Sequence, residues 1–353
     1  MLHPLPAGER HAFEKRGPTI SDVAERAGVS KATVSRYLSG RSDILADATW
    51  KLIQQTIADF HYHPSQIARS LKGGRTRLFG MVVADVTNPY SVAVLRGAED
   101  ECRRSGYVLA LCNSNGSQEL EQALLASLRA YQIEGLILNS AGGPAEALSN
   151  AMPDGLPIVL LDRVLSSRQF DFVGLANAAA AGEATRHLIA QGFTDLALLS
   201  EPMEGVSVRL ERALGFREAA EQHGQCTGTV LEIDLNQPDA MRLALARFIA
   251  APSAKRKAII AASGLVTLRA FQAIQRLGIR VPGDLGLVGF DELEWSSLVS
   301  PGITTIAQPT YDIGVAAVRD LVARVEGAAV EPQRTIFSGT LIQRGSSGAT
   351  AAE

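Results

Sequence analysis

The chain has 353 residues, which is enough for two or three domains with sizeable cores. With 46% hydrophobic and 20% charged residues it has the composition of an ordinary globular protein, and no apolar run approaches the length of a membrane span. The net charge of -3 is uneven, because residues 1–77 carry 12 Lys and Arg against 7 Asp and Glu, a net +5 that leaves -8 for the remainder. This asymmetry favours a protein whose N-terminal part alone meets phosphates.

The cysteines and the N-terminal segment indicate the compartment. Cys102, Cys112 and Cys226 form an odd number without CxxC spacing, which favours reduced thiols over a disulfide framework or a metal site. Residues 1–17 lack the apolar core of a secretory signal and are interpreted as a disordered leader. We therefore expect a cytoplasmic protein that does not enter a membrane.

Residues 19–38 predict two short helices joined by a tight turn. Apolar residues recur at three- and four-residue spacing on the first helix: Ile20, Val23, Ala24 and Ala27. Thr19 is a good N-cap, with Asp22 three residues later at the positive end of the helix. Gly28 suits a left-handed turn that ends the first helix, and Ser30 caps the second, whose Val34 points inward.

The outer face of the second helix is small, polar and basic. It presents Lys31, Ala32, Ser35 and Arg36. A helix, a glycine turn and a helix with such a face fit the major groove of DNA. The alternative is an amphipathic helical pair that packs on another part of the protein.

The segment from Thr19 to Arg36 resembles the DNA-binding motif of the LacI/GalR (lactose-repressor) family, whose pattern T-I-x-D-V-A-x-x-A-G-V-S-x-x-T-V-S-R it matches at every fixed position. The resemblance implies a transcription regulator that binds a pseudo-palindromic operator in double-stranded DNA as a homodimer. The DNA contacts that we expect from these helices are Thr19, Ser30, Lys31, Ala32, Thr33, Ser35, Arg36 and Tyr37. Lys31, Ala32 and Arg36 suit base edges, and the hydroxyl side chains suit phosphates.

A third helix is predicted over about residues 46–60, and it ends before His63 and Pro64. Its capping is expected to shift to Asp43 or Asp47, because Leu45 stands where the family often has a good cap. Residues 64–77 are predicted to form a hinge helix and linker. In the family this stretch binds the operator, which implies contacts from Ala68, Leu71 and Lys72, with Leu71 as a wedge in the minor groove. A linker with an incidental leucine is the alternative.

From residue 78 onward, short apolar strands alternate with helices. The predicted strands are 79–86, 107–112, 135–139, 158–162, 196–200, 230–233, 258–262 and 285–290. This pattern predicts parallel, doubly wound sheets in two lobes. The expected fold is thus an all-α helix-turn-helix headpiece (18–63) and an α/β domain (78–345) that resembles the periplasmic binding proteins and carries effector binding and dimerisation. Residues 346–353 are expected to be a flexible tail, and its lack of heptads favours a dimer over a tetramer.

Ligands of parallel sheets bind outside the carboxyl ends of the strands, so the residues after each strand are candidates. The predicted effector-binding residues are Asn88, Tyr90, Asp162, Arg163, Arg212, Ser263, Asp291 and Gln308. Carboxylates, amides and arginines around an aromatic ring suit a polyhydroxylated ligand. In the family, D-x-x-N-P-[FY], L-D-R, an arginine three residues before Gly-Phe, and G-[FY]-D carry most of these positions, which implies a sugar or sugar acid as effector.

The chain also departs from the family at the expected cleft. Ser263 and Gly264 replace a common Asn-Asp, Ala176 replaces a common aspartate, and Leu235 aligns with a position that often stacks an aromatic ring on the ligand. Arg209 is a spare cation that could take the carboxylate of a sugar acid.

Other chemistries have no anchor in the sequence. No G-x-G-x-x-G or Walker A loop follows a predicted strand, and no G-x-S-x-G elbow is present. We therefore expect no catalytic residue, cofactor or metal, and interpret the chain as a repressor of a carbohydrate or sugar-acid utilisation operon, controlled by an effector between the lobes. The alternatives are a sugar-binding module without a regulatory role, a corepressor-dependent regulator, and an enzyme of sugar metabolism on the same fold.

Overall fold

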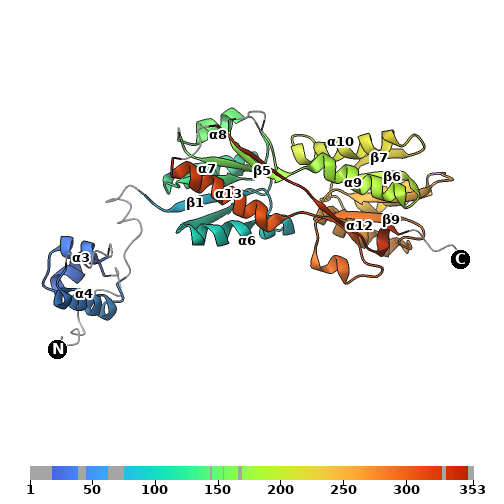
Figure 1. Cartoon of the computed structure of the whole chain (residues 1–353). Coiled ribbons are helices and arrows are strands. Elements are labelled where there is room, and N and C mark those ends of the chain that lie inside the picture. The colour runs from blue at the N-terminus through green and yellow to red at the C-terminus, as the bar shows by residue number, and fades with distance from the viewer. Residues whose placement is uncertain are drawn as a thin grey trace. The chain divides into compact units, whose positions relative to one another are not determined.

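The computed structural model describes residues 18–38, 45–62, 75–143, 145–153, 155–165, 169–327 and 331–348 (Figure 1). The chain divides into two compact units, Met1–Thr76 and Arg77–Glu353. Within the described residues, no helix combines the length and the apolar character that crossing a bilayer requires.

The described residues of the first unit form the helices α2 (Ile20–Arg26), α3 (Lys31–Leu38) and α4 (Asp47–Asp59). Their shared core consists of Val23, Ala24, Ala27, Val34, Ile53, Phe60 and Tyr62. The predicted start of α2 is confirmed, because Asp22 Oδ2 accepts a hydrogen bond from the Thr19 backbone N–H at 2.7 Å and Thr19 Oγ1 accepts one from Asp22 N–H. Gly28 has the expected left-handed backbone, with φ of +60°.

The predicted cap of the third helix at Asp47 is wrong, and the other candidate, Asp43, lies outside the described residues. Ala46 is the N-cap of α4 and supplies no side-chain hydrogen bond. Asp47 is instead the first helical residue, where its carboxylate meets the positive end of the helix dipole.

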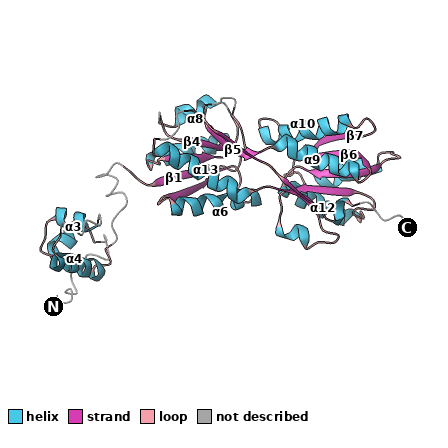
Figure 2. Cartoon of the chain, in the orientation of Figure 1, coloured by secondary structure: helices cyan, strands magenta, loops and turns pink. Residues whose placement is uncertain are grey.

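The second unit contains two lobes, each with one six-stranded sheet between helices (Figure 2). Lobe 1 contains β1 (Leu78–Val83), β2 (Val108–Asn113), β3 (Gly135–Leu138), β4 (Ile158–Leu161), β5 (Asp171–Leu175) and β11 (Arg334–Phe337), with α6 (Pro89–Arg104), α7 (Gln118–Ala130), α8 (Ala145–Ala151) and α13 (Thr310–Val325). Lobe 2 contains β6 (Phe193–Ser200), β7 (Thr227–Glu232), β8 (Arg256–Ala261), β9 (Gly286–Phe290), β10 (Thr304–Ala307) and β12 (Thr340–Ile342), with α9 (Asn177–Ala190), α10 (Ser207–Gln222), α11 (Ala240–Ala250), α12 (Gly264–Leu277) and the short 3₁₀ turns η2 (Glu294–Ser297) and η3 (Gly345–Ser347).

The strand orders are β11-β5-β4-β3-β1-β2 in lobe 1 and β12-β10-β9-β8-β6-β7 in lobe 2. Every pairing is parallel except that of β12 with β10. The eight predicted strands are present, with ends that differ by a few residues. Four strands were not predicted: β5, β10, β11 and β12. All four contain five residues or fewer and include a charged residue or a threonine, whereas the predicted strands β3 and β4, which are equally short, include neither.

The chain crosses between the lobes three times, from β5 to α9, from β10 to α13 and from β11 to β12 (Figure 1). Each crossing starts from a strand that was not predicted: β5, β10 or β11. Since they are the covalent connections between the lobes, a relative movement of the lobes has to bend them.

The flexible tail expected from residue 346 does not begin there. Ser346 and Ser347 lie in η3 and are fully buried. Ser346 Oγ donates to the Leu287 carbonyl at 2.6 Å and accepts from Thr304 N–H at 2.8 Å, while Ser347 Oγ is hydrogen-bonded to His187 Nε2 at 2.7 Å. These bonds fasten the segment after β12 to lobe 2.

Candidate functional sites

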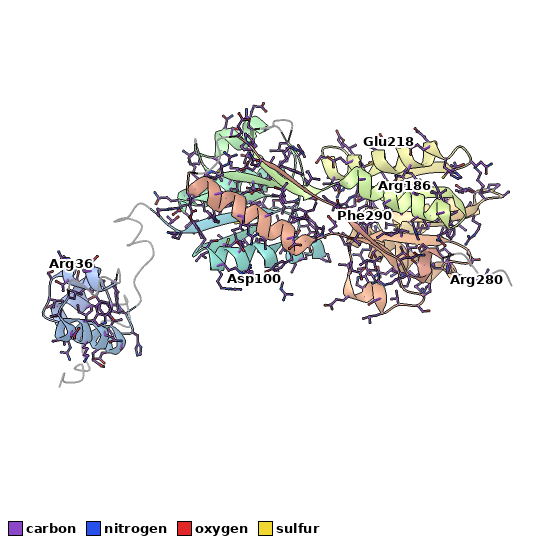
Figure 3. The ribbon with its side chains drawn as sticks, viewed as in Figure 1. Arg36, Asp100, Arg186, Glu218, Arg280 and Phe290 are labelled. Carbon is purple, nitrogen blue, oxygen red and sulfur yellow. The ribbon has the colours of Figure 1, made fainter. Side chains whose placement is uncertain are left out.

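The outer face of α3 carries the predicted base-contacting residues. Lys31, Ala32 and Arg36 are exposed, whereas Val34 on the opposite side is fully buried. Figure 3 shows Arg36 at the surface of the first unit. The structure therefore presents these three side chains on one accessible face, as an insertion into a DNA groove requires.

The hydroxyl residues of this face are partly engaged in shaping α3. Ser30 Oγ accepts a hydrogen bond from Thr33 N–H at 3.1 Å and lies 2.9 Å from Thr33 Oγ1. Ser35 is half-buried, and Tyr37 stacks at a tilt on Trp50 with ring centroids 4.2 Å apart. Ser30 thus starts α3 as expected. The remaining predicted contacts, Ala68, Leu71 and Lys72, lie outside the described residues.

A polar cleft, partly open to solvent, lies where the carboxyl ends of both sheets face each other. The eight residues predicted for the effector site all line it: Asn88, Tyr90, Asp162, Arg163, Arg212, Ser263, Asp291 and Gln308. Six further lining residues were not predicted from the sequence: Ser200, Glu201, Val206, Val208, Ala262 and Val266. Ser200 and Glu201 end and follow β6, so the strand-end rule could have found them.

The lobe 1 wall of the cleft starts at the head of α6. Asn88 caps this helix by accepting a hydrogen bond from Tyr90 N–H at 3.1 Å, and Pro89 occupies the first helical position, where it needs no donor. This cap turns the Tyr90 side chain into the cleft, where it is buried.

Each lobe contributes one aspartate that directly follows a strand, and the two aspartates have the same backbone conformation. Asp162 comes directly after β4 with φ of +63°, and Asp291 directly after β9 with φ of +69°. Asp291 accepts from Gly264 N–H at 2.8 Å and from Gln308 Nε2 at 2.6 Å. The left-handed backbone, which Asp tolerates better than most residues, places both carboxylates at the cleft.

Arg212 is a fixed donor in lobe 2. It is 4% exposed, and its guanidinium stacks on the Phe290 ring at 4.2 Å from the ring centroid. Phe290 lies on the side of lobe 2 that faces lobe 1 (Figure 3). Arg212 Nε donates to Asn177 Oδ1 at 2.9 Å and Nη1 donates to the Ala262 carbonyl at 2.5 Å. These contacts hold the arginine in one orientation before a ligand binds.

Three buried polar atoms of the cleft have no hydrogen-bond partner among the described residues: Tyr90 Oη, Asp162 Oδ1 and Gln308 Oε1. Burial raises the pKa of the Asp162 carboxyl, and burial together with the nearby Asp162 and Asp291 raises the pKa of Tyr90 well above its usual value. Because an unpaired buried polar atom costs free energy, this cluster is suited to a polar ligand that supplies the missing hydrogen bonds.

The remaining arginines of the cleft are paired with protein groups. Arg163 Nη1 donates to the Ser140 carbonyl at 2.7 Å, and burial lowers its pKa. Arg209, expected to be a spare cation for an acidic ligand, forms an ion pair of 2.8 Å with Glu201 and donates to the Pro202 carbonyl at 2.6 Å. Arg209 thus lines the cleft but is already paired with Glu201, so it is not the spare cation that was expected.

Two further expectations from the sequence concerned Leu235 and a metal site. Leu235 does not line the cleft and packs with the lobe 2 core cluster that contains Leu245. Among the residues that the structure describes, no group of three His, Cys, Asp or Glu side chains is placed to hold a metal ion.

The comparisons with known proteins agree with this architecture. Residues 19–65 match the lacI family of bacterial regulatory proteins, and residues 185–347 match a periplasmic binding protein-like domain. The HTH-type transcriptional regulator PtxS of Pseudomonas aeruginosa is 45% identical over 93% of this chain and 95% of its own length. The lac repressor dimer bound to operator and the anti-inducer ONPF shares the fold, with a TM-score of 0.82 and 24% identity over 94% of this chain and 99% of that chain.

A complex of the transcriptional regulator CelR with cellobiose is also similar, with a TM-score of 0.68 and 26% identity over 93% of this chain and 99% of that chain. The match to PtxS spans nearly both full chains at an identity that leaves the family in no doubt. The chain belongs to the lacI family of bacterial regulatory proteins, and is a DNA-binding transcription regulator with a periplasmic binding protein-like second domain.

Proposed function

We propose that this regulator represses genes for the use of a carbohydrate or sugar acid, and that a molecule of this class binds in the cleft as its effector. The observation that carries the proposal is the cluster of three unpartnered buried atoms on Tyr90, Asp162 and Gln308. A ligand with several hydroxyl groups can pair with all three at once. The cellobiose complex of the similar regulator CelR supports a carbohydrate ligand.

Each cleft residue has a distinct role in this proposal. The carboxylates of Asp162 and Asp291 accept hydrogen bonds from ligand hydroxyls, and Arg212 donates to ligand oxygens. The Tyr90 ring covers an apolar face of the ligand, and Asn88, Ser263 and Gln308 complete the polar lining. The carboxylate of a sugar acid would be bound by Arg163 or Arg212, because Arg209 is already neutralised by Glu201.

The regulator acts in the cytoplasm as a homodimer on a pseudo-palindromic operator, because a two-fold symmetric protein imposes a two-fold symmetric site. The operator-bound lac repressor dimer, which shares the fold, supports this arrangement. Lys31, Ala32 and Arg36 reach base edges, while the remaining headpiece contacts fix the register on phosphates: Thr19, Ser30, Thr33, Ser35 and Tyr37. We expect Ala68, Leu71 and Lys72, which lie outside the described residues, to contact the minor groove between the half-sites.

Effector binding controls the operator through the three crossings between the lobes. A ligand held by residues of both lobes favours one relative arrangement of the lobes over others. It changes operator affinity only to the extent that its own affinity differs between the two arrangements. The coupling is reciprocal, so operator DNA must change effector affinity by the same factor.

The decisive experiment selects fragments of the source genome with the purified protein and sequences the bound DNA. We expect enrichment of a short palindrome near genes for sugar or sugar-acid transport or catabolism. Titration of the bound fragment with hexoses, pentoses and hexonates then identifies the effector class. Arg212→Ala should keep operator binding and lose the response to the effector.

Other outcomes distinguish the alternatives. Enrichment only when cell metabolites are added would indicate a corepressor-dependent regulator. No enrichment above a salt-sensitive background under either condition would contradict the proposal and leave a sugar-binding module without a regulatory role.

A further inference from the structure

Glu121 is a buried carboxylate of lobe 1 that does not line the cleft. It lies on α7 and is only 3% exposed. Its two oxygens bind one loop, since Oε1 accepts from Ser140 Oγ at 3.1 Å and Oε2 accepts from Ala141 N–H at 2.5 Å. Burying a carboxylate costs free energy unless it is hydrogen-bonded. The two hydrogen bonds from the loop offset this cost for Glu121.

The loop that Glu121 holds, residues 140–143, follows β3 at the cleft end of the sheet. Ser140 Oγ also accepts a hydrogen bond from Gly142 N–H at 3.1 Å, and Ser140 itself is 1% exposed. The backbone is left-handed at Gly142 and Gly143, with φ of +112° and +103°. Such a glycine loop has many alternative conformations and needs anchors to keep one of them.

Ser140 connects this loop to the cleft. Its hydroxyl binds Glu121, while its carbonyl accepts the hydrogen bond from Arg163 Nη1 at 2.7 Å. The position of the Arg163 guanidinium therefore depends on where the Ser140 peptide lies. Burial raises the pKa of the Glu121 carboxyl above its usual value, although the hydrogen bonds with Ala141 and Ser140 and the charge of Arg163 oppose this shift.

We infer that Glu121 is a positioning residue of the cleft, which fixes loop 140–143 and, through the Ser140 carbonyl, holds Arg163 in place for the ligand. The inference rests on the proposed role of Arg163 in effector binding. The hydrogen bonds that it invokes join groups of the protein itself. The inference can therefore be tested without knowing the effector.

The test compares Glu121→Ala with Glu119→Ala, which removes an exposed carboxylate from the same helix. Hydrogen exchange reports the protection of the Ala141 and Gly142 amides. Phenylglyoxal labelling with mass spectrometry reports the reactivity of Arg163, with the exposed Arg217 as internal reference. In Glu121→Ala we expect both the exchange and the Arg163 labelling rate to rise by about tenfold, and in Glu119→Ala neither.

Two conservative variants separate positioning from simple charge balance, and they remain informative if Glu121→Ala does not fold. Glu121→Gln keeps the reach of the side chain and an acceptor for Ala141 N–H, and Ser140 Oγ can accept from its amide. Glu121→Asp keeps the charge and loses the reach. Positioning predicts labelling of Arg163 within about twofold of the native protein in Glu121→Gln and clearly faster labelling in Glu121→Asp.

Three results would overturn the inference. The first is a Glu121→Ala protein in which the Ala141 and Gly142 amides stay protected from exchange. The second is a Glu121→Ala protein in which these amides exchange faster while the labelling rate of Arg163 is unchanged. The third is the reverse order of the conservative variants, which would assign Glu121 the role of a countercharge. None of these readouts uses an effector, so a failure of the proposed function would be seen separately in the operator titrations.

Discussion

The side-chain oxygen of Asn177 accepts a hydrogen bond from Arg212 Nε at 2.9 Å. Asn177 is the first residue of α9, directly after the crossing from β5, and is 1% exposed. Its amide nitrogen donates to the Leu175 carbonyl and to Glu211 Oε2, both at 3.1 Å. One buried amide thus ties an arginine of the cleft to a segment that has to bend when the lobes move.

Asn177→Ala should weaken both stability and effector response. The substitution leaves Arg212 Nε and the Leu175 carbonyl without these partners in a buried place, so we expect a loss of about 1–3 kcal/mol in the free energy of unfolding. Urea denaturation measures this loss, and operator release by the effector measures the response. The matched control is Asn236→Ala, at an exposed loop position. If both variants behave alike, the contact with Arg212 has no energetic importance.

Gly215→Ala should destabilise lobe 2 by forcing two helices apart. A Cβ built at Gly215 on α10 would lie 1.9 Å from the Ala178 carbonyl oxygen on α9. Overpacking of this kind costs about 1–3 kcal/mol and at times more, and here the obstacle is backbone rather than a flexible side chain. Thermal or urea denaturation measures the effect. Gly224→Ala, where nothing lies within 4 Å of the added Cβ, is the control and should be near neutral. Equal stability of the two variants would contradict the close approach of α9 and α10.

Asp320→Asn should change the pH dependence of stability. Asp320 on α13 has a buried Oδ2 without a partner among the described residues and lies near Asp171, which is engaged by Arg324 at 2.7 Å. Burial first, and then the charge of Asp171, raise the pKa of Asp320 from 3.8 to about 6. Between these values the folded state binds more protons than the unfolded state, so this group lowers stability as the pH rises through the window.

Asparagine at position 320 stays neutral and does not suffer this loss. The difference in unfolding free energy between Asp320→Asn and the native protein should therefore grow by about 1–3 kcal/mol in favour of the variant between pH 4 and pH 7. Urea denaturation of both proteins at several pH values measures it. A difference that is constant with pH, or that shrinks as the pH rises, would show that Asp320 titrates near its ordinary value.

The cleft lining could be predicted from the sequence because strand ends and side-chain types are local properties. Asp162 and Asp291 each follow an apolar run, and parallel strands bring their carboxyl ends to one edge. The pairing of Arg209 with Glu201 could not be predicted, since it depends on the distance between two side chains in the folded chain, and nothing in the sequence singled out Glu201. Glu121 was missed because, on an amphipathic helix, a buried glutamate has the same pattern as a solvated one.

The fold was predictable where a run of apolar residues marks a strand, as in β3 and β4. In the missed strand β11, exposed and half-buried residues alternate, and its partner β5 is far away in sequence. Such a strand is fixed by tertiary pairing rather than by its own pattern. The same holds for Ser346 and Ser347, whose burial follows from contacts with β9 and β10 and from no local signal.

Arg36→Ala should abolish discrimination at one base pair of each operator half-site. Arg36 is exposed on the outer face of α3, and an arginine in the major groove can donate two hydrogen bonds to guanine O6 and N7. Its loss should reduce the preference for the native base at that position by about 1–3 kcal/mol and leave the other positions unchanged. Competition binding against single-base operator variants, taken from the genomic selection, measures this preference. Lys51→Ala removes an exposed positive charge from α4 and should change affinity for all variants by a similar factor. If Arg36→Ala also weakens all variants uniformly, Arg36 contacts phosphate, and the base contact has to be assigned to another residue of α3.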